Sequence, residues 1–425
     1  MSCAAEKKPV RAENEEMHSG MEADNSCAAS PARNSAEVRS ADGKPRAALF
    51  ISSLTRGGAE RVMVNLAGYL KKAGWELLLV TQYQQKEEYP VPAGVRRVLS
   101  DLTPEETAAG LLARPRNLSR RLRKLERIWA SFDPDLIVAF NGKNNIMAVE
   151  SARKGRYPVV VFGVSEPHLE YPTFPMWHSM IRAFTRADGV ILTTHRCIDE
   201  FPVKIRAHAV ALPTPLSESF LTGPAPWPRE RRIVSVGRLD SNKNQTMMME
   251  AFGRAAREIP GWTLELYGDG EDREILARRA EEINRELMSW KGAEDIHPAG
   301  EIRLCGRTED VPAAIRSASV FLLTSDIEGM PNSLLEAMSL GLACISTDCP
   351  CGGPAEVIRD GENGLLVPVR DTEALTAALE KLMRSPDLCR RLGQSAEQIR
   401  TTHAPEAAMQ AWERYLLTKA RPRED

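Results

Sequence analysis

The sequence of 425 residues lacks both long apolar runs and a strong net charge. No stretch approaches the about eighteen consecutive apolar residues of a membrane-spanning helix. The first residues, MSCAAEKK, have no apolar core like that of a signal peptide. The net charge at pH 7 is −2, which argues against a nucleic-acid partner bound through a basic surface. We therefore expect a cytoplasmic globular protein.

Patterns typical of metal sites are also missing. The eight Cys residues are scattered without metal-ligand spacing, and the one close pair is Cys349 and Cys351. In a cytosolic chain we expect them to be reduced and mostly buried, with a redox role for this pair as the alternative. No convincing Asp-X-Asp motif stands in a strand-end loop, which agrees with a site that needs neither a metal nor another cofactor.

Short apolar runs that alternate with helical segments make up most of the chain. This alternation is typical of parallel sheets with helices on both faces, and it predicts an α/β protein with two doubly wound, Rossmann-like domains. The predicted parts are a disordered tail (1–45), a first domain (46–212), a linker with five prolines (213–230), a second domain (231–403) and a helix crossing back to the first domain (404–425). The predicted strands are 47–52, 76–81, 135–140, 157–164, 189–193, 232–237, 262–267, 302–305, 319–324 and 344–346.

The most informative segment is 326–336, which follows the apolar run 319–324 and enters a helical pattern. Ligands collect at the carboxyl ends of parallel strands, where free N–H groups of the next helix face the crevice. Glu328 would stand before the helix and Glu336 about one turn inside it. The alternatives are a solvated loop acid for Glu328, and a capping box in which Glu336 bonds back to the helix start near Ser333.

A second loop, 236–244, leaves the predicted strand 232–237 and carries Arg238 and Lys243. An arginine fork and a lysine ammonium could together neutralise a diphosphate without a metal. A solvated pair of cations is the alternative.

Gly57 and Gly58 lie between a strand and a helix, where the backbone can approach an anion closely. A plain tight turn has the same pattern and is the alternative.

Taken together, these motifs resemble the retaining glycosyltransferases of family 4, whose two facing Rossmann-like domains form the GT-B fold. The resemblance covers about residues 46–417. It rests on GGAERV (57–62), VGR (236–238) with Lys243, Gly306-Arg307, the spacing of Glu328 and Glu336, and CPCGGP (349–354) with Asn363-Gly364. YGDG (267–270) lacks the third glycine of a dinucleotide fingerprint, so a dehydrogenase is a weak alternative.

The resemblance implies transfer of a hexose or N-acetylhexosamine from a nucleotide-sugar, UDP-linked in our prediction, with retained anomeric configuration and no metal. The acceptor would be a glycan or a polyprenyl-pyrophosphate-linked oligosaccharide. Arg238 and Lys243 would bind the diphosphate, Glu328 the donor sugar and Glu336 the ribose. Further donor-site residues would be Gly58, Arg307, Gly329, Met330, Asn332 and Ser333.

The sequence departs from the family pattern on the acceptor side. Many members place a histidine in the crevice of the first domain, but here the loop after 135–140 begins with Asn141 and has none before Asn145. Asn141, Glu166 and His168 are the acceptor-side candidates. The missing histidine leaves open a sugar-nucleotide-binding scaffold without turnover. A sugar-nucleotide epimerase of the same fold is the other alternative.

Residues 114–129 predict a basic amphipathic helix. Seven cations accompany a stripe formed by Leu118, Leu122, Leu125 and Trp129. The stripe would pack on the first domain. The cations would face solvent, the anionic inner face of the cytoplasmic membrane, or a lipid-linked pyrophosphate acceptor.

Overall fold

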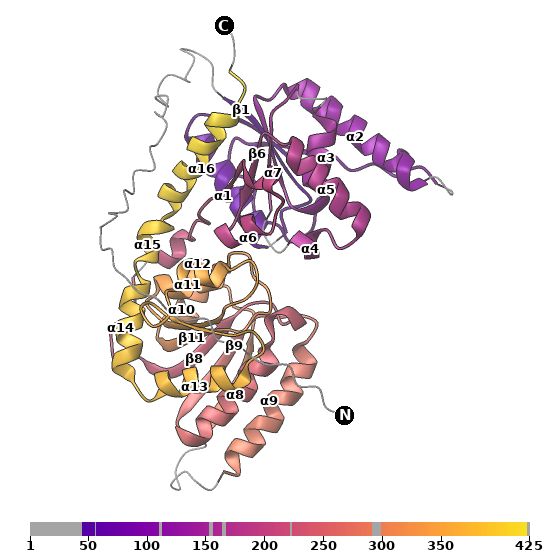
Figure 1. Cartoon of the computed structure of the whole chain (residues 1–425). Coiled ribbons are helices and arrows are strands. Elements are labelled where there is room, and N and C mark those ends of the chain that lie inside the picture. Colours follow the sequence, from indigo (N-terminus) through magenta and orange to yellow (C-terminus); the bar gives the residue numbers. More distant parts are fainter. Residues whose placement is uncertain are drawn as a thin grey trace, which may run out of the picture. The chain divides into compact units, whose positions relative to one another are not determined.

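The structure, a computed structural model, describes residues 45–55, 57–109, 113–152, 156–163, 167–221, 223–290 and 299–422. Apart from Pro45, the predicted disordered tail lies outside these residues. The described chain is built around two parallel sheets with helices packed on them (Figure 1).

The first sheet has seven strands in the described part of the chain, in the order β3-β2-β1-β4-β5-β6-β7, and every pairing is parallel. The strands are β1 Arg46–Ile51, β2 Glu76–Thr81, β3 Arg96–Leu99, β4 Leu136–Phe140, β5 Val159–Phe162, β6 Gly189–Leu192 and β7 Ala209–Ala211. The helices between them are α1 Gly58–Lys72, α2 Ala113–Phe132, α3 Gly142–Ser151, α4 Pro167–Glu170, α5 Phe174–Arg186, α6 His195–Asp199 and α7 Val203–Arg206.

The second sheet has six described strands in the order β10-β9-β8-β11-β12-β13, again all parallel. They are β8 Glu230–Val236, β9 Trp262–Tyr267, β10 Gly300–Gly306, β11 Ala318–Leu323, β12 Ala343–Thr347 and β13 Leu365–Val367. The short helices η1 Glu218–Leu221 and η2 Ser241–Lys243 lie before and after β8. The longer and later helices are α8 Gln245–Glu258, α9 Arg273–Met288, α10 Val311–Ile315, α11 Asn332–Ser339, α12 Gly353–Val357, α13 Thr372–Met383, α14 Pro386–Ala396, α15 Ile399–Thr402 and α16 Pro405–Lys419.

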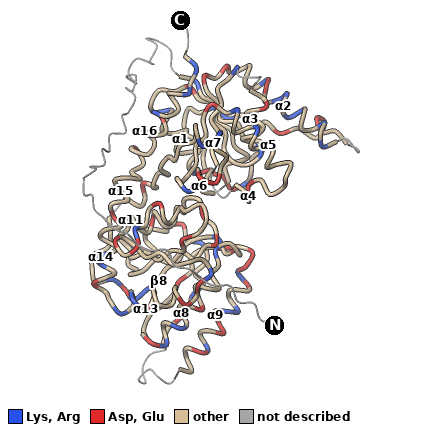
Figure 2. The backbone as a smooth tube through the Cα atoms, viewed as in Figure 1, with Lys and Arg blue, Asp and Glu red and all other residues tan. Residues whose placement is uncertain are grey.

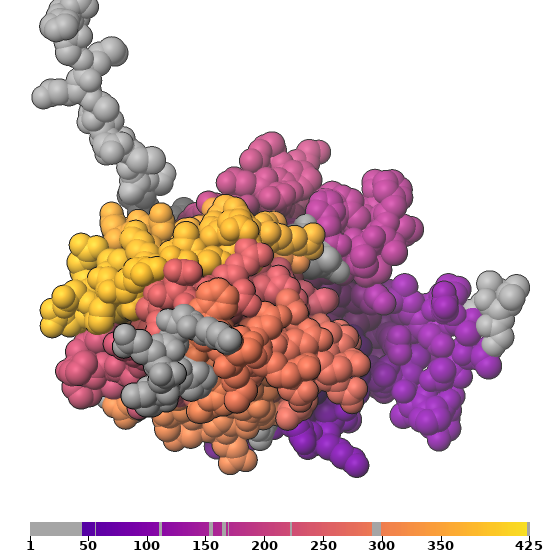
Figure 3. Space-filling model, turned by 90° about the horizontal axis from the view of Figure 1, so that it is seen from below, coloured from indigo at the N-terminus to yellow at the C-terminus, as the bar shows by residue number. Residues whose placement is uncertain are grey.

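Both faces of each sheet are packed, which explains the nearly continuous apolar runs of the strands. In β1, Leu49 packs in a core with Leu66 of α1, whereas the next residue, Phe50, packs in a core with Trp129 of α2. In the second sheet, α8, α9 and α13 cover one face and α11 the other. The space-filling view shows the yellow C-terminal residues directly against the orange residues of this half (Figure 3).

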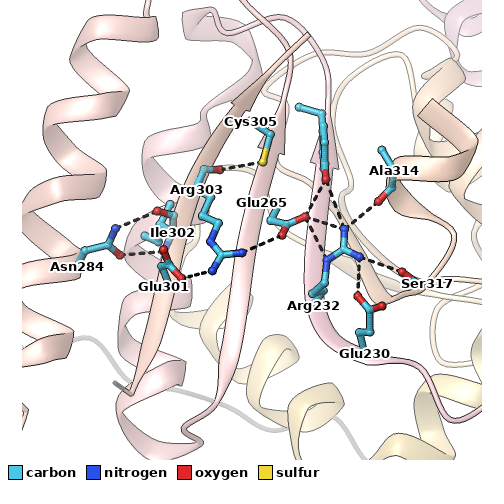
Figure 4. Close-up of polar contacts among 11 residues, drawn as sticks. Glu230, Arg232, Glu265, Asn284, Glu301, Ile302, Arg303, Cys305, Ala314 and Ser317 are labelled. Atoms are coloured by element: carbon cyan, nitrogen blue, oxygen red, sulfur yellow. Dashed lines mark hydrogen bonds and ion pairs between the residues drawn. The ribbon is translucent and has the colours of Figure 1, made fainter. Parts of the chain in front are cut away.

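One face of the second sheet carries a polar network in addition to its apolar core (Figure 4). Glu265 of β9 alternates with the core residues Leu264 and Leu266, so it points to the opposite face, where it is 6% exposed. Arg232 of β8 donates from Nε and Nη2 to Glu265 Oε2 at 3.1 and 2.7 Å. The remaining contacts of Arg232 are with Glu230, Ser317, Tyr267 and the carbonyl oxygen of Ala314.

Helix α16 packs on the first sheet, although it follows the second in sequence. The ring of Trp412 stacks on Phe140 at 5.9 Å between centroids and meets Phe162 edge-on at 5.1 Å. Glu413 accepts a hydrogen bond from Trp75 Nε1 at 2.9 Å. The end of the described chain is therefore part of the core that contains β1 and β4.

The predicted parallel α/β architecture is confirmed. The predicted strands agree with the structure within a few residues, and β2 and β9 agree at both ends. Three short strands, β3, β7 and β13, were not predicted. Among the described residues, no helix is at once long enough and apolar enough to span a membrane.

Candidate functional site

Two loops are joined where the strand order of the second sheet reverses, between β8 and β11. The amide of Asp326 donates to Asn242 O at 2.8 Å, and Asn242 Nδ2 donates to Ile327 O at 3.0 Å. The Thr324 hydroxyl donates to Lys243 O at 2.8 Å. A crevice at the carboxyl ends of strands beside such a reversal is the usual ligand site of open α/β sheets. These bonds bring the two charged motifs into one site.

Lys243 and Glu328 form an ion pair in this crevice. The Nζ atom of Lys243 contacts Glu328 Oε1, and Ser325 Oγ donates to the same oxygen at 2.6 Å. The side chains are only 19% and 12% exposed, so Glu328 is not the solvated loop acid of the alternative interpretation. Asp240 caps η2 by accepting a bond from the Lys243 amide at 3.2 Å, which fixes the backbone from which the lysine extends.

A pocket of about 570 Å³ opens beside this pair. It is lined by Arg238, Ser241, Asn242, Lys243, Asp326, Ile327, Glu328, Gly329 and Arg370. Each of its three cations is paired with a carboxylate: Lys243 with Glu328, Arg370 with Asp326 at 2.8 Å, and Arg238 with Asp240 at 3.0 Å. An anion entering the pocket would therefore meet three cations held by neighbouring acids. The side chain of Arg238 is 79% exposed, which fits the alternative interpretation of a solvated cation.

Glu336 is the fifth residue of α11 and is 6% exposed. The alternative interpretation, a capping box, is wrong, because the helix already begins at Asn332 after Pro331 and has no side-chain cap bond. The carboxylate of Glu336 instead accepts a hydrogen bond from Nη1 of Arg61 in α1 at 2.6 Å. Burial raises the pKa of Glu336, and the charge of Arg61 partly opposes this shift.

The start of α11 presents the backbone amides that the sequence predicts. Asn332 and Ser333 are the first two residues of the helix, so their N–H groups have no partner within it. Gly58, the first residue of α1, lies close to this helix start, since a Cβ atom on Gly58 would be 2.9 Å from Asn332 Nδ2. Gly329 lines the pocket, whereas Met330 is buried in the apolar core beside α11.

Five residues of the predicted donor site do not line this pocket, namely Gly58, Met330, Asn332, Ser333 and Glu336. Arg307 is a sixth. It follows β10, the edge strand of the sheet, and does not line the pocket. Its side chain is 74% exposed, with Nε 3.8 Å from Asp269. A role for Arg307 at the donor stays a prediction.

Two acceptor-side candidates, Asn141 and His168, follow β4 and β5 in the chain. Asn141 precedes α3 with a positive φ (64°), and its buried Oδ1 has no hydrogen-bond partner within the described chain. His168 stacks on Trp177 with ring centroids 4.1 Å apart. Glu166 lies outside the described residues. None of the three has a tested role.

The glycine-rich segment 349–354 contacts the first half of the chain. The carbonyl oxygen of Cys351 accepts a hydrogen bond from the Thr194 hydroxyl, and Arg196 pairs with Asp348 at 2.5 Å. Cys349 and Cys351 are both buried and not in a disulfide. Burial, with a contribution from the charge of Glu328, raises the pKa of Cys349 to about 12. A thiol with such a pKa is a poor nucleophile at neutral pH.

No group of three or more His, Cys, Asp or Glu side chains in the described ranges has an arrangement that could hold a metal ion. Cationic side chains do line the pocket, namely Arg238, Lys243 and Arg370.

Two residues of this region were missed by sequence reasoning. Arg61 stands within GGAERV, but nothing in the sequence links it to Glu336, 275 positions away. Arg61 lies one turn after Gly58, in the first turn of a helix that follows a glycine-rich loop. This position was the available signal for a role at the site. Arg370 follows the unpredicted strand β13 and had no comparable signal.

Helix α2 is only partly packed. Leu125 and Trp129 are buried as predicted, but Leu118 is 49% exposed, so the first part of the apolar stripe does not pack on the first domain. Arg121 and Lys124 pair with Asp101 and Glu106 at 2.8 and 2.9 Å. Lys and Arg recur along the helix (Figure 2), and the exposed cations are Arg114, Arg116, Arg120, Arg123 and Arg127.

Comparison with known proteins identifies both halves of the chain. Residues 57–233 match the model of the glycosyl transferase 4-like domain, and residues 230–385 match that of the glycosyl transferases group 1. An exopolysaccharide phosphotransferase of Streptomyces coelicolor is 32% identical over 247 residues, which cover 56% of this chain and 24% of that protein. The chain spans about half of two further curated relatives, 47% and 50% of their lengths.

Other relatives match over most of their length. The GalNAc-alpha-(1->4)-GalNAc-alpha-(1->3)-diNAcBac-PP-undecaprenol alpha-1,4-N-acetyl-D-galactosaminyltransferase of Campylobacter jejuni is 24% identical over 351 residues, 82% of this chain and 92% of that protein. The crystal structure of Anabaena HepE in complex with UDP superimposes with a TM-score of 0.71 at 15% identity, covering 88% of this chain and all of that one. The chain therefore belongs to the glycosyltransferase family that its motifs resemble, with a 4-like first domain, a group 1 second domain and the GT-B fold.

Proposed function

We propose that the protein transfers a hexose or N-acetylhexosamine from a UDP-linked donor to a glycan or a polyprenyl-pyrophosphate-linked oligosaccharide, with retained anomeric configuration and without a metal. The observation that carries this proposal is the pair of Lys243 and Glu328 in the pocket between β8 and β11. In this pair Lys243 would bind the leaving phosphate, and the neighbouring Glu328 would accept hydrogen bonds from the sugar hydroxyls.

The leaving diphosphate would be stabilised by side chains. Lys243 and Arg238 line the pocket together with the loop that leads to the free amides of α11. Preorganised positive charge lowers the barrier, because negative charge develops on the diphosphate as the sugar departs. A lysine whose ammonium is already held by Glu328 needs little rearrangement to meet a phosphate oxygen.

Glu328 fits the role of a hydrogen-bond acceptor for the donor sugar better than that of a nucleophile. Lys243 and Ser325 both donate to its Oε1, which withdraws electron density from that oxygen. In a retaining reaction without a protein nucleophile, the leaving phosphate takes the proton of the acceptor hydroxyl. The cations around the phosphate would then position the group that acts as base.

The choice of donor and acceptor is supported by relatives. The Campylobacter jejuni relative is named for transfer of N-acetyl-D-galactosamine to a PP-undecaprenol-linked oligosaccharide, and the Anabaena neighbour is bound to UDP. The exposed cations of α2 would attract an anionic membrane or the pyrophosphate of such an acceptor.

The test incubates the purified chain with UDP-, GDP- and ADP-sugars and a bacterial lipid extract, with EDTA present. We expect sugar transfer from a UDP-sugar into the lipid fraction, and a product that keeps the anomeric configuration of the donor. An isomerised donor without transfer would identify an epimerase. Donor binding without any product would identify a scaffold, and activity that EDTA abolishes would overturn metal independence.

A further inference from the structure

One ion pair joins the two halves of the chain at the proposed ribose site. Arg61 lies in the first turn of α1, on the first sheet, and Glu336 lies in α11, on the second. Nη1 of Arg61 is 2.6 Å from Glu336 Oε1, and the side chains are 24% and 8% exposed. A pair this short and this buried is held in one geometry by its surroundings.

The contact leaves both groups partly free. Only Oε1 of Glu336 accepts a bond from Arg61, and within the described residues its Oε2 has no partner. Arg61 donates through one of its guanidinium nitrogens, and the others have no acceptor in the same part of the chain. A ligand hydroxyl can therefore bond to Glu336 while the ion pair persists.

The charge of Glu336 depends on this arginine. Burying a carboxylate without a partner is costly, and a lone buried acid takes up a proton instead. Helix α11 packs against β11, β12, η1, α14 and α15. The ionisable groups of these elements are Glu218, Asp387, Cys344, Cys389, Arg390, Arg391 and Arg400. None of them pairs with Glu336 in the described chain, and Arg400 donates to Ser339 O.

We propose that Arg61 is a positioning residue of the donor site, which holds Glu336 in place as acceptor for the ribose hydroxyls, so that this site is complete only when the two halves of the chain are in contact. The inference rests on the proposed function, to which it adds the ribose contact that the family resemblance implies for Glu336. It assigns to the first half of the chain a part in binding the nucleotide.

Loss of the arginine should make nucleotide binding depend on pH. Burial already raises the pKa of Glu336, and removing Arg61 removes the charge that opposes this rise. At a given pH a larger share of the acid would then be protonated, and a protonated acid is a poorer acceptor. As the pH rises through the elevated pKa, the carboxylate forms again and affinity recovers.

The experiment measures UDP binding to the full chain by calorimetry from pH 6.5 to 9. For Arg61→Met we expect affinity about tenfold lower at pH 7, the equivalent of one charged hydrogen bond, with partial recovery by pH 9. Arg61→Lys keeps the charge and should stay within about threefold of the wild type. Arg46→Met is the matched control, because Arg46 has similar exposure (21%) and pairs with Glu76 away from the pocket.

Glu336→Gln separates the possible failures. It should bind UDP weakly at every pH, and adding Arg61→Met to it should cost nothing further, since the two residues act as one unit. If Glu336→Gln binds like the wild type, the proposed ribose role fails together with this inference. The role of Arg61 alone is overturned by either of two results. In the first, Glu336→Gln binds UDP weakly but Arg61→Met binds it like the wild type. In the second, the losses of affinity of the two variants add in the double variant.

Discussion

At the scale of single residues, the pocket is an arrangement of paired charges. Lys243 is mostly buried and shares Glu328 with Ser325, whereas Arg370 is 75% exposed and pairs with Asp326 near solvent. Water and salt screen an exposed charge far more than a buried one. Two cations of one pocket should therefore contribute very differently to catalysis.

Lys243→Met should lower the turnover number of sugar transfer about a hundredfold, the usual loss when one preorganised transition-state donor is removed. Arg370→Met removes a cation from the same pocket and is the matched comparison, with an expected loss under about tenfold. Initial-rate kinetics at saturating donor measure both. Equal losses would show that burial of the lysine does not determine its contribution.

At the scale of helices and strands, the predictions succeeded where apolar runs are long. The run over β9 is bounded by Pro260-Gly261 and Gly268, so both ends were predictable. Strand β3 (RRVL) carries two arginines at the sheet edge, and β7 and β13 have three residues each. Such strands are stabilised by pairing with a neighbouring strand. They leave too little hydrophobic periodicity in the sequence to be predicted from it.

Arg232→Met should destabilise the second sheet by about 3 kcal/mol, because it leaves Glu265 buried without its main partner (Figure 4). Urea unfolding measures the loss. The double variant Arg232→Met with Glu265→Leu should recover much of it, since no buried charge then remains. If the double variant has a lower free energy of unfolding than Arg232→Met, then Glu265 stabilises the sheet even without Arg232, and the unpaired charge is not the cause of the loss.

Helix α2 offers a test of membrane attraction that spares its internal ion pairs. Charge reversal at the exposed Arg116, Arg123 and Arg127 should abolish binding to vesicles with 30% phosphatidylglycerol, because each cation near such a surface contributes about 1 kcal/mol. Reversal of Arg182, Arg206 and Arg254, on other helices, is the control and should bind normally. Flotation measures both, and unchanged binding of the α2 variant refutes the membrane role.

At the scale of the whole molecule, contacts far apart in sequence unite the chain. The charged motifs 236–244 and 326–336 could be recognised from the sequence, because each follows a clear strand and occupies consecutive positions. The pairing of Arg61 with Glu336, and that of Arg196 with Asp348, could not, since each depends on how two separately formed sheets meet. The acceptor side is the least predictable part, because the segment Asn141–Asn145 contains no histidine to match the family pattern.

Trp412→Ala should destabilise the first sheet by about 3–5 kcal/mol, since the buried ring packs on Phe140 and Phe162. Hydrogen exchange should accelerate in β4 and β5 and stay unchanged in β8 and β9. Trp290→Ala, at 43% exposure, is the control and should cost little. Uniform acceleration through both sheets would show that the halves unfold as one cooperative unit.

The position of α16 also has a consequence for synthesis on the ribosome. Domains usually fold in the order in which they emerge, from the N-terminus onward. Here the first sheet waits for residues that are translated after the whole second sheet, because Met409, Trp412 and Leu416 belong to its core. The nascent first half would expose apolar surface around Phe140 throughout that interval, and a chaperone that shields this surface would raise the yield of folded enzyme.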